Sequence, residues 1–156
     1  MKINMNLKFA ALTALAVTLL CQTSITRADD RGKRDNLGQQ AKVTFTKWVT
    51  AWPLMAGVAG GVVGDGSFAG EVLKYTSGPV TTIEALYHVT GPKHSFTALV
   101  HVEQTGLKAV IIGVVTDGWL KGHAVQGEYT QIVCEHDGIA SPCYQGSLEI
   151  QRDSRD

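Results

Sequence analysis

The sequence predicts an all-β protein, an antiparallel meander of about eight strands closed into a small β-barrel. Short β-branched and aromatic runs alternate with Gly, Pro and Asp-Gly from residue 41 onward, which is typical of strands joined by tight turns. No stretch keeps an apolar period of 3.6 residues, and 17 glycines among 156 residues oppose helix formation. Closure into a barrel is expected because it removes the exposed edges of an open sheet.

Residues 41–156 are long enough for one domain, which we expect to be the barrel. The strand-like runs within it recur at near-regular spacing. They span residues 43–50, 58–63, 67–75, 80–90, 95–104, 107–116, 123–135 and 144–150.

Residues 1–28 have the layout of a cleavable secretory signal. Lys2 and Lys8 precede an apolar run over residues 9–20 that is too short to span a bilayer comfortably. Small residues then predict cleavage before Asp29. We therefore expect a secreted or periplasmic protein.

One alternative stays open at Cys21, because a cysteine directly after an apolar run is a lipidation site in bacterial lipoproteins. Leu20 before it does not suit that signal, which favours a cysteine lost with the signal peptide. The next segment, residues 29–40, is charged and polar and is predicted to be flexible, because it cannot bury enough apolar surface to offset the entropy of ordering.

Charge and cysteine content limit the classes of partner. The predicted signal holds three of the 14 basic residues and none of the 14 acidic ones, so the exported part carries a small acidic excess and we expect no nucleic acid. No second apolar run reaches spanning length, so no membrane span is expected in the mature protein. An oxidising compartment predicts a disulfide between Cys134 and Cys143.

The hairpin over residues 80–104 has a register that aligns one apolar face. A turn around Pro92 and Lys93 achieves this, and Thr105-Gly106 as the next turn places Glu103 opposite Lys108. Glu84, His101 and Glu103 are then predicted on the outer face. The predicted interior residues are Ile83, Ala85, Tyr87, Val89, Phe96, Ala98, Val100, Val102, Ala109 and Ile111.

The run 107–116 is apolar on both faces. Leu107 is expected on the inner face, while Val110, Ile112 and Val114 with Leu99 form an exposed aliphatic patch, which predicts a homo-oligomer. The alternative is a covering segment of the same chain, around residues 48–55.

The turn at Asp117-Gly118 leaves two registers for the next strand. A plain two-residue turn would put Gln126 and Glu128 inside the barrel. We prefer a bulged turn, because the cysteines then face each other outside the core. The bulged turn places Val125, Tyr129, Val133, Tyr144, Leu148 and Ile150 inside.

No motif predicts a metal site, a phosphate loop or a hydrolase triad. His101 and Glu103 share a strand face, but a third ligand would have to come from Glu84 or His88 and no metal-binding spacing is present. The glycine-rich segment 57–66 lacks the Lys-Ser/Thr of a phosphate loop, and no serine lies in a G-x-S-x-G context. We identify no catalytic residue and expect no cofactor.

Four aromatic residues are candidates for binding a small apolar ligand in the barrel lumen, because tyrosine hydroxyls add polar contacts to apolar walls. The alternative is a filled aromatic and aliphatic core. The candidates are Phe68, Tyr87, Phe96 and Tyr129.

The segments Gly-Ser-Phe-Ala-Gly-Glu-Val (66–72), Gly-Glu-Tyr (127–129) and Gln-Gly-Ser-Leu-Glu-Ile (145–150) resemble the allene oxide cyclase-like and dirigent-like barrels over roughly residues 42–150. The resemblance implies an eight-stranded, often oligomeric barrel whose lumen binds apolar molecules, in some members guiding cyclisation or coupling without a cofactor. No catalytic residue of that family matches a position here.

Two functions are therefore predicted from different classes. The first is a secreted barrel that binds a small apolar ligand in its lumen, with cofactor-independent isomerase or cyclase activity as its catalytic form. The alternative is a non-catalytic secreted interaction or assembly module.

Overall fold

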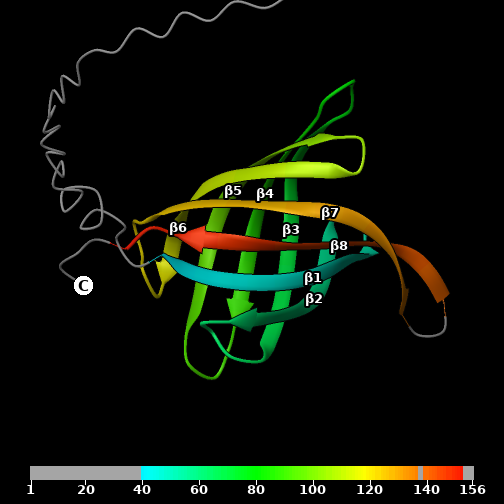
Figure 1. The fold of residues 1–156 in the computed structure, drawn as a ribbon. Coiled ribbons are helices and arrows are strands. Elements are labelled where there is room, and N and C mark those ends of the chain that lie inside the picture. Colours follow the sequence, from blue (N-terminus) through cyan, green and yellow to red (C-terminus); the bar gives the residue numbers. More distant parts are fainter. Residues whose placement is uncertain (1–39, 137–138, 153–156) are drawn as a thin grey trace, which may run out of the picture.

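The computed structural model describes residues 40–136 and 139–152, and within them it confirms the predicted all-β barrel (Figure 1). Neighbouring strands pair antiparallel in chain order, and β1 pairs with β8 to close the barrel. The signal peptide (1–28), Cys21 and residues 29–39 of the lead-in lie outside the described residues. The strands are β1 (Ala41–Ala51), β2 (Leu54–Gly61), β3 (Gly66–Thr76), β4 (Thr81–Thr90), β5 (Ser95–Thr105), β6 (Lys108–Gly118), β7 (Ala124–His136) and β8 (Ile139–Ile150).

Alternation along each strand sends apolar side chains into the barrel and polar ones to solvent. In β1, for example, Val43 and Phe45 are buried while Lys42 and Thr44 are exposed. The predicted interior is confirmed: every one of those residues is buried except Ile83, which is partly buried and packs against the core.

The register of β4 against β5 is as predicted, but the next hairpin differs by two residues. Glu103 lies opposite Val110, and Lys108 lies opposite Thr105. The turn is Gly106-Leu107, because glycine with a φ of 58° suits the first central position of a two-residue hairpin turn. A shift of two residues keeps every side chain on its predicted face, except that Leu107 moves into the turn and is 59% exposed.

The predicted bulged turn at Asp117-Gly118 is not formed, because residues 119–123 connect β6 to β7 and Val114 lies opposite Ala124 without a bulge. The faces predicted for β7 are nevertheless correct inside the barrel and wrong beyond it. Val125 and Tyr129 are buried, whereas Val133, also predicted inside, is 79% exposed. The reason is that β7 and β8 pair with each other over a longer stretch than either pairs with its other neighbour, β6 or β1. Their pairing runs from Val125↔Ile150 to His136↔Ile139. Their hairpin (orange in Figure 1) projects past the barrel, where there is no interior to point into.

A disulfide between Cys134 and Cys143 ties this projecting hairpin, with Cα atoms 5.8 Å apart, as predicted. The two cysteines lie diagonally across the pair of strands, because Cys134 is opposite Ser141 and Cys143 is opposite Ile132. Such a bond indicates an oxidising, extracellular type of environment. Among the described residues there is no helix that is long and apolar enough to cross a membrane.

The two ends of the barrel differ. We call one the capped end, because Val63 is fully buried there and Trp119 and Leu120 pack against the core. The ring of His94 stacks on Trp119 with centroids 3.9 Å apart. The opposite end, formed by the β1–β2, β3–β4 and β5–β6 turns and the β7–β8 hairpin, we call the open end.

Candidate functional site

A lysine points into the barrel, where sequence reasoning placed only apolar and aromatic side chains. Lys47 follows Val43 and Phe45 on the inner face of β1 and is 3% exposed. Among the described residues it is the one charged side chain that is buried. A buried charge is costly unless its surroundings compensate it, so what surrounds Lys47 matters.

The Lys47 Nζ atom donates a hydrogen bond to the Tyr87 hydroxyl on β4. Five aromatic rings surround this amine from β1, β3, β4, β7 and β8, and we call them the aromatic cage. The distances from Nζ to the ring centroids are 4.1 Å for Tyr87, 4.8 Å for Tyr129, 5.6 Å for Phe45 and Phe68, and 5.9 Å for Tyr144.

Burial shifts the protonation of these groups toward their neutral forms. Desolvation lowers the pKa of the Lys47 ammonium from 10.5 to about 7. Desolvation also raises the pKa of the Tyr87 and Tyr129 hydroxyls, which therefore stay protonated. Near neutral pH the lumen thus holds an amine that both gives and accepts protons, beside hydroxyls that donate hydrogen bonds.

Lys47 lies on the wall of a cavity of about 260 Å³, which we call the lumen cavity. This volume is just below the range of about 300–1,000 Å³ common for small-molecule sites. No carboxylate of the described residues lines it, and its polar side-chain groups besides Lys47 are hydroxyls, amides and the Trp52 indole N–H. The lining residues are Lys47, Val49, Trp52, Met55, Val72, Tyr75, Thr81, Ile83, Tyr87, Gln104, Tyr129, Gln131 and Tyr144.

Three glycines lie opposite large side chains of the site and let the neighbouring strands approach closely. Lys47 lies opposite Gly57, Tyr87 opposite Gly70, and Tyr129 opposite Gly146 in the strand registers. A Cβ at Gly146 would collide with the Glu128 carbonyl oxygen and with the Tyr129 Cβ. Lys47, Tyr87 and Tyr129 therefore each have one cross-strand neighbour without a side chain.

The cavity reaches the open end through an apolar rim. The rings of Trp52 and Tyr75 meet edge to face there, with centroids 5.5 Å apart, and both residues are exposed. Val49 also lines the cavity and is exposed. Deeper in, the Tyr129 hydroxyl donates to the Gln104 Oε1 atom at 2.9 Å, which holds that ring in place.

The four lumen candidates from the sequence separate into three groups. Tyr87 and Tyr129 line the cavity. Phe68 belongs to the aromatic cage but does not line the cavity, and it contacts Tyr87 with ring centroids 4.9 Å apart. Phe96 is buried near the capped end, opposite Val89 and Gly118, away from the cavity.

Sequence reasoning missed Lys47, although a signal for it exists. Residues 43, 45, 47 and 49 form one face of β1, and three of them are apolar, so the alternation alone places Lys47 among inward-facing positions. A charged residue at such a position is the type that burial perturbs and that functional sites use.

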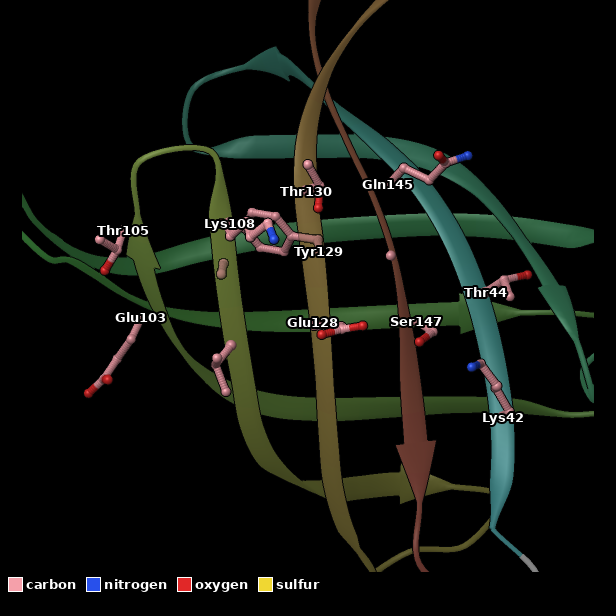
Figure 2. Close-up of a pocket in the computed structure, with 13 residues that line it drawn as sticks. Lys42, Thr44, Glu103, Thr105, Lys108, Glu128, Tyr129, Thr130, Gln145 and Ser147 are labelled. Carbon is pink, nitrogen blue, oxygen red and sulfur yellow. The ribbon is translucent and has the colours of Figure 1, made fainter. Parts of the chain in front are cut away.

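A larger depression of about 600 Å³ lies on the outer surface over β5, β6, β7, β8 and β1, and we call it the outer groove. Figure 2 shows Glu128, Ser147 and Lys42 pointing toward one another across three of these strands. Its charged side chains are exposed, and Lys42 pairs with Glu149 at 3.8 Å. Solvated charges of this kind bind small ligands weakly, so we consider the smaller lumen cavity the better candidate site.

The residues considered as metal ligands form ion pairs or hydrogen bonds with single neighbouring side chains. His101 pairs with Glu103 at 3.7 Å, Glu84 pairs with Lys74 at 3.8 Å, and His88 hydrogen-bonds Thr97. Within residues 40–136 and 139–152, no group of three or more His, Cys, Asp or Glu side chains is arranged to hold a metal ion.

Comparison of the chain with protein-family models, with curated proteins and with solved structures gives no match. The resemblance to the allene oxide cyclase-like and dirigent-like barrels therefore stays a prediction, and function has to be argued from the site itself.

Proposed function

We propose that the barrel binds one small, mainly apolar molecule in the lumen cavity, with a polar oxygen of that molecule facing Lys47 and Tyr87. The buried Lys47, facing a cavity that no carboxylate of the described residues lines, is the observation that carries this proposal. A ligand oxygen that accepts a hydrogen bond from Nζ would offset part of the cost of burying the amine. A barrel with a filled core would instead have an apolar side chain at this position.

The rest of the cavity favours an apolar body for the ligand. Met55, Val72 and Ile83 line its middle, and Trp52 with Tyr75 forms the exposed rim. Burying apolar surface against such walls contributes about 25 cal/mol per Å². A molecule with an apolar body and one carbonyl or carboxylate end fits this distribution of groups.

The proposal extends to an exported protein, since the Cys134–Cys143 disulfide is stable in the periplasm or outside the cell. The same geometry supports a cofactor-independent isomerisation or cyclisation as its catalytic form. Lys47 accepts a proton near neutral pH, and the Tyr87 hydroxyl beside it stays protonated to donate one.

Native mass spectrometry of the purified protein tests lumen binding, with small molecules released on denaturation identified afterwards. We expect one bound molecule per chain, lost in Lys47→Met and retained in Lys42→Met. Lys42 lies on the same strand but points outward, so it is the matched control. Equal occupancy in both variants would place the ligand elsewhere.

A second function, assembly through the outer face, is favoured by a separate observation. Val110, Ile112 and Val114 on β6 and Leu99 on β5 are exposed as predicted, with Val110 61% exposed. Residues 48–55, considered as a covering segment, instead form the end of β1 and the start of β2, and no described residue covers the patch. An aliphatic patch of this kind is buried in many symmetric assemblies.

Sedimentation of the wild type and of Ile112→Lys tests this assembly. We expect the wild type to sediment as an oligomer and the variant as a folded monomer. A wild type that is monomeric at micromolar concentration excludes assembly through this face.

A further inference from the structure

We propose that Lys47 captures the carbonyl carbon of a small apolar aldehyde as a Schiff base inside the lumen, an inference that rests on the lumen cavity being the binding site. A bound carbonyl compound would then be held by a covalent and reversible bond. The argument uses the position of the amine, its protonation and the groups around it.

The position of Lys47 suits a nucleophile. Lys47 lines the lumen cavity and its Nζ atom is held by the Tyr87 hydroxyl, so the amine is ordered before a ligand enters. Within the part of the chain that the structure describes, no other lysine lines this cavity. An aldehyde whose body occupies the apolar part of the cavity would bring its carbonyl end to this amine and to no other.

Protonation separates Lys47 from the surface lysines, because only a neutral amine has the lone pair that attacks a carbonyl. With a pKa of about 7, about half of the Lys47 side chains are neutral at pH 7, against roughly one in 2,500 for a solvated lysine with a pKa of about 10.4. Lys42 on the same strand is exposed and paired with Glu149. The lumen amine is therefore the favoured site of reaction at neutral pH.

The reaction balances without a cofactor. The Nζ lone pair attacks the carbonyl carbon, the carbonyl oxygen gains a proton, and the nitrogen loses one, which gives a carbinolamine. Loss of the carbinolamine hydroxyl as water, with one more proton supplied and one returned, leaves the imine. Amine plus aldehyde thus becomes imine plus water, and nothing is oxidised or reduced.

The surroundings favour both the reaction and its product. The Tyr87 hydroxyl adjoins Nζ and stays protonated, so it can donate a hydrogen bond to the carbonyl oxygen and then to the departing hydroxyl. A protonated imine keeps its positive charge among the aromatic rings that already surround Nζ, where the ring faces attract it.

Reductive trapping with benzaldehyde and cyanoborohydride tests the inference, read out by intact mass and peptide mapping. At pH 7 and limiting aldehyde we expect a single benzyl group per chain, on Lys47. Labelling of Lys47 should fall to background in Lys47→Met and be unchanged in Lys42→Met. From pH 6 to 8 the rate of labelling at Lys47 should rise and then level, while the surface lysines keep gaining reactivity. The other titratable groups that line the cavity are Tyr75, Tyr87, Tyr129 and Tyr144.

A competition within the wild-type chain keeps the test independent of how any variant folds. Benzyl alcohol has the same apolar body and cannot form an imine, so an excess should slow labelling of Lys47 at least tenfold and leave Lys42 unchanged. If benzyl alcohol binds in the cavity but Lys47 is labelled no faster than Lys42, the covalent inference is wrong and lumen binding stands. If benzyl alcohol does not bind and Lys47 is not labelled, both proposals fail for this class of ligand.

Discussion

The two halves of the barrel lumen are built from the same strands but differ in packing and polarity. Toward the capped end the interior is filled by side chains such as Val63, Val89, Phe96 and Leu148, all of them apolar and buried. Toward the open end the interior holds Lys47 and tyrosines around a cavity of about 260 Å³. The comparison teaches that packing in one half supplies stability, which lets the other half carry an unfavourable buried amine.

The largest effect is expected from a substitution in the capped half. Val89→Asp buries a carboxylate where no partner exists within the apolar cluster, and we expect loss of the folded state at 25 °C. Circular dichroism and size-exclusion chromatography measure this. The neighbouring His88→Ala, on the outer face, should change stability by no more than about 1 kcal/mol. The opposite ranking would mean that the strands face the other way.

The next effect concerns Lys47 and its pH dependence. Since the folded pKa is depressed to about 7, the unfolded chain binds more protons between about pH 7 and 10, and stability rises with pH across that window. Below pH 7 Lys47 is protonated in both the folded and the unfolded chain, so the full cost of burying its charge lowers the free energy of unfolding. We expect Lys47→Met to be more stable than the wild type at pH 7, on the order of 3 kcal/mol, with the difference shrinking by pH 9.

Urea denaturation of both proteins at pH 7, 8 and 9 measures this difference, and Lys42→Met is the control. A difference that stays constant with pH would show that Lys47 is not held in its neutral form. The range stops at pH 9 because the raised pKa values of Tyr87 and Tyr129 destabilise the fold at higher pH, when tyrosines of the unfolded chain ionise.

Removing the disulfide tests how far the open half depends on its projecting hairpin. Cys134→Ala with Cys143→Ala opens a short loop, and we expect a loss of about 2–3 kcal/mol in the free energy of unfolding. Amide hydrogen exchange should rise in the β7–β8 hairpin and stay low in β4 and β5. Uniformly faster exchange would mean that the hairpin supports the whole barrel.

The smallest effect is expected from a substitution of one of the cross-strand glycines. In Gly70→Ala the added Cβ meets the Met55 Cε atom at 2.8 Å and the Phe68 Cε1 atom at 3.2 Å. The flexible Met55 side chain has to move, and since it lines the cavity we expect the cavity to change shape. We expect a change in stability of about 1 kcal/mol or less and weaker binding of benzyl alcohol by about three- to tenfold. A fluorescence titration with benzyl alcohol measures the binding, and Gly78→Ala, in the β3–β4 turn, is the control that should leave it unchanged.

Short-range features were predictable because they depend on residues close in sequence. The β4–β5 register followed from one apolar face and a short turn, and the Cys134–Cys143 pair followed from export and proximity. The β5–β6 register was two residues off because the position of Gly106 within its turn depends on its φ of 58°. Val133 was misplaced because alternation does not reveal where a barrel ends.

By itself the sequence determined the fold class, the inward and outward faces of most strands, the exposed patch on β6 and the aromatic character of the lumen. Only the tertiary structure decided that the lumen contains a cavity and a buried amine. Closure pairs β1 with β8, and the registers place Gly57, Gly70 and Gly146 opposite Lys47, Tyr87 and Tyr129. Periodicity assigns a side chain to a face, but burial, a shifted pKa and a cavity arise only when distant strands surround that side chain and exclude water from it.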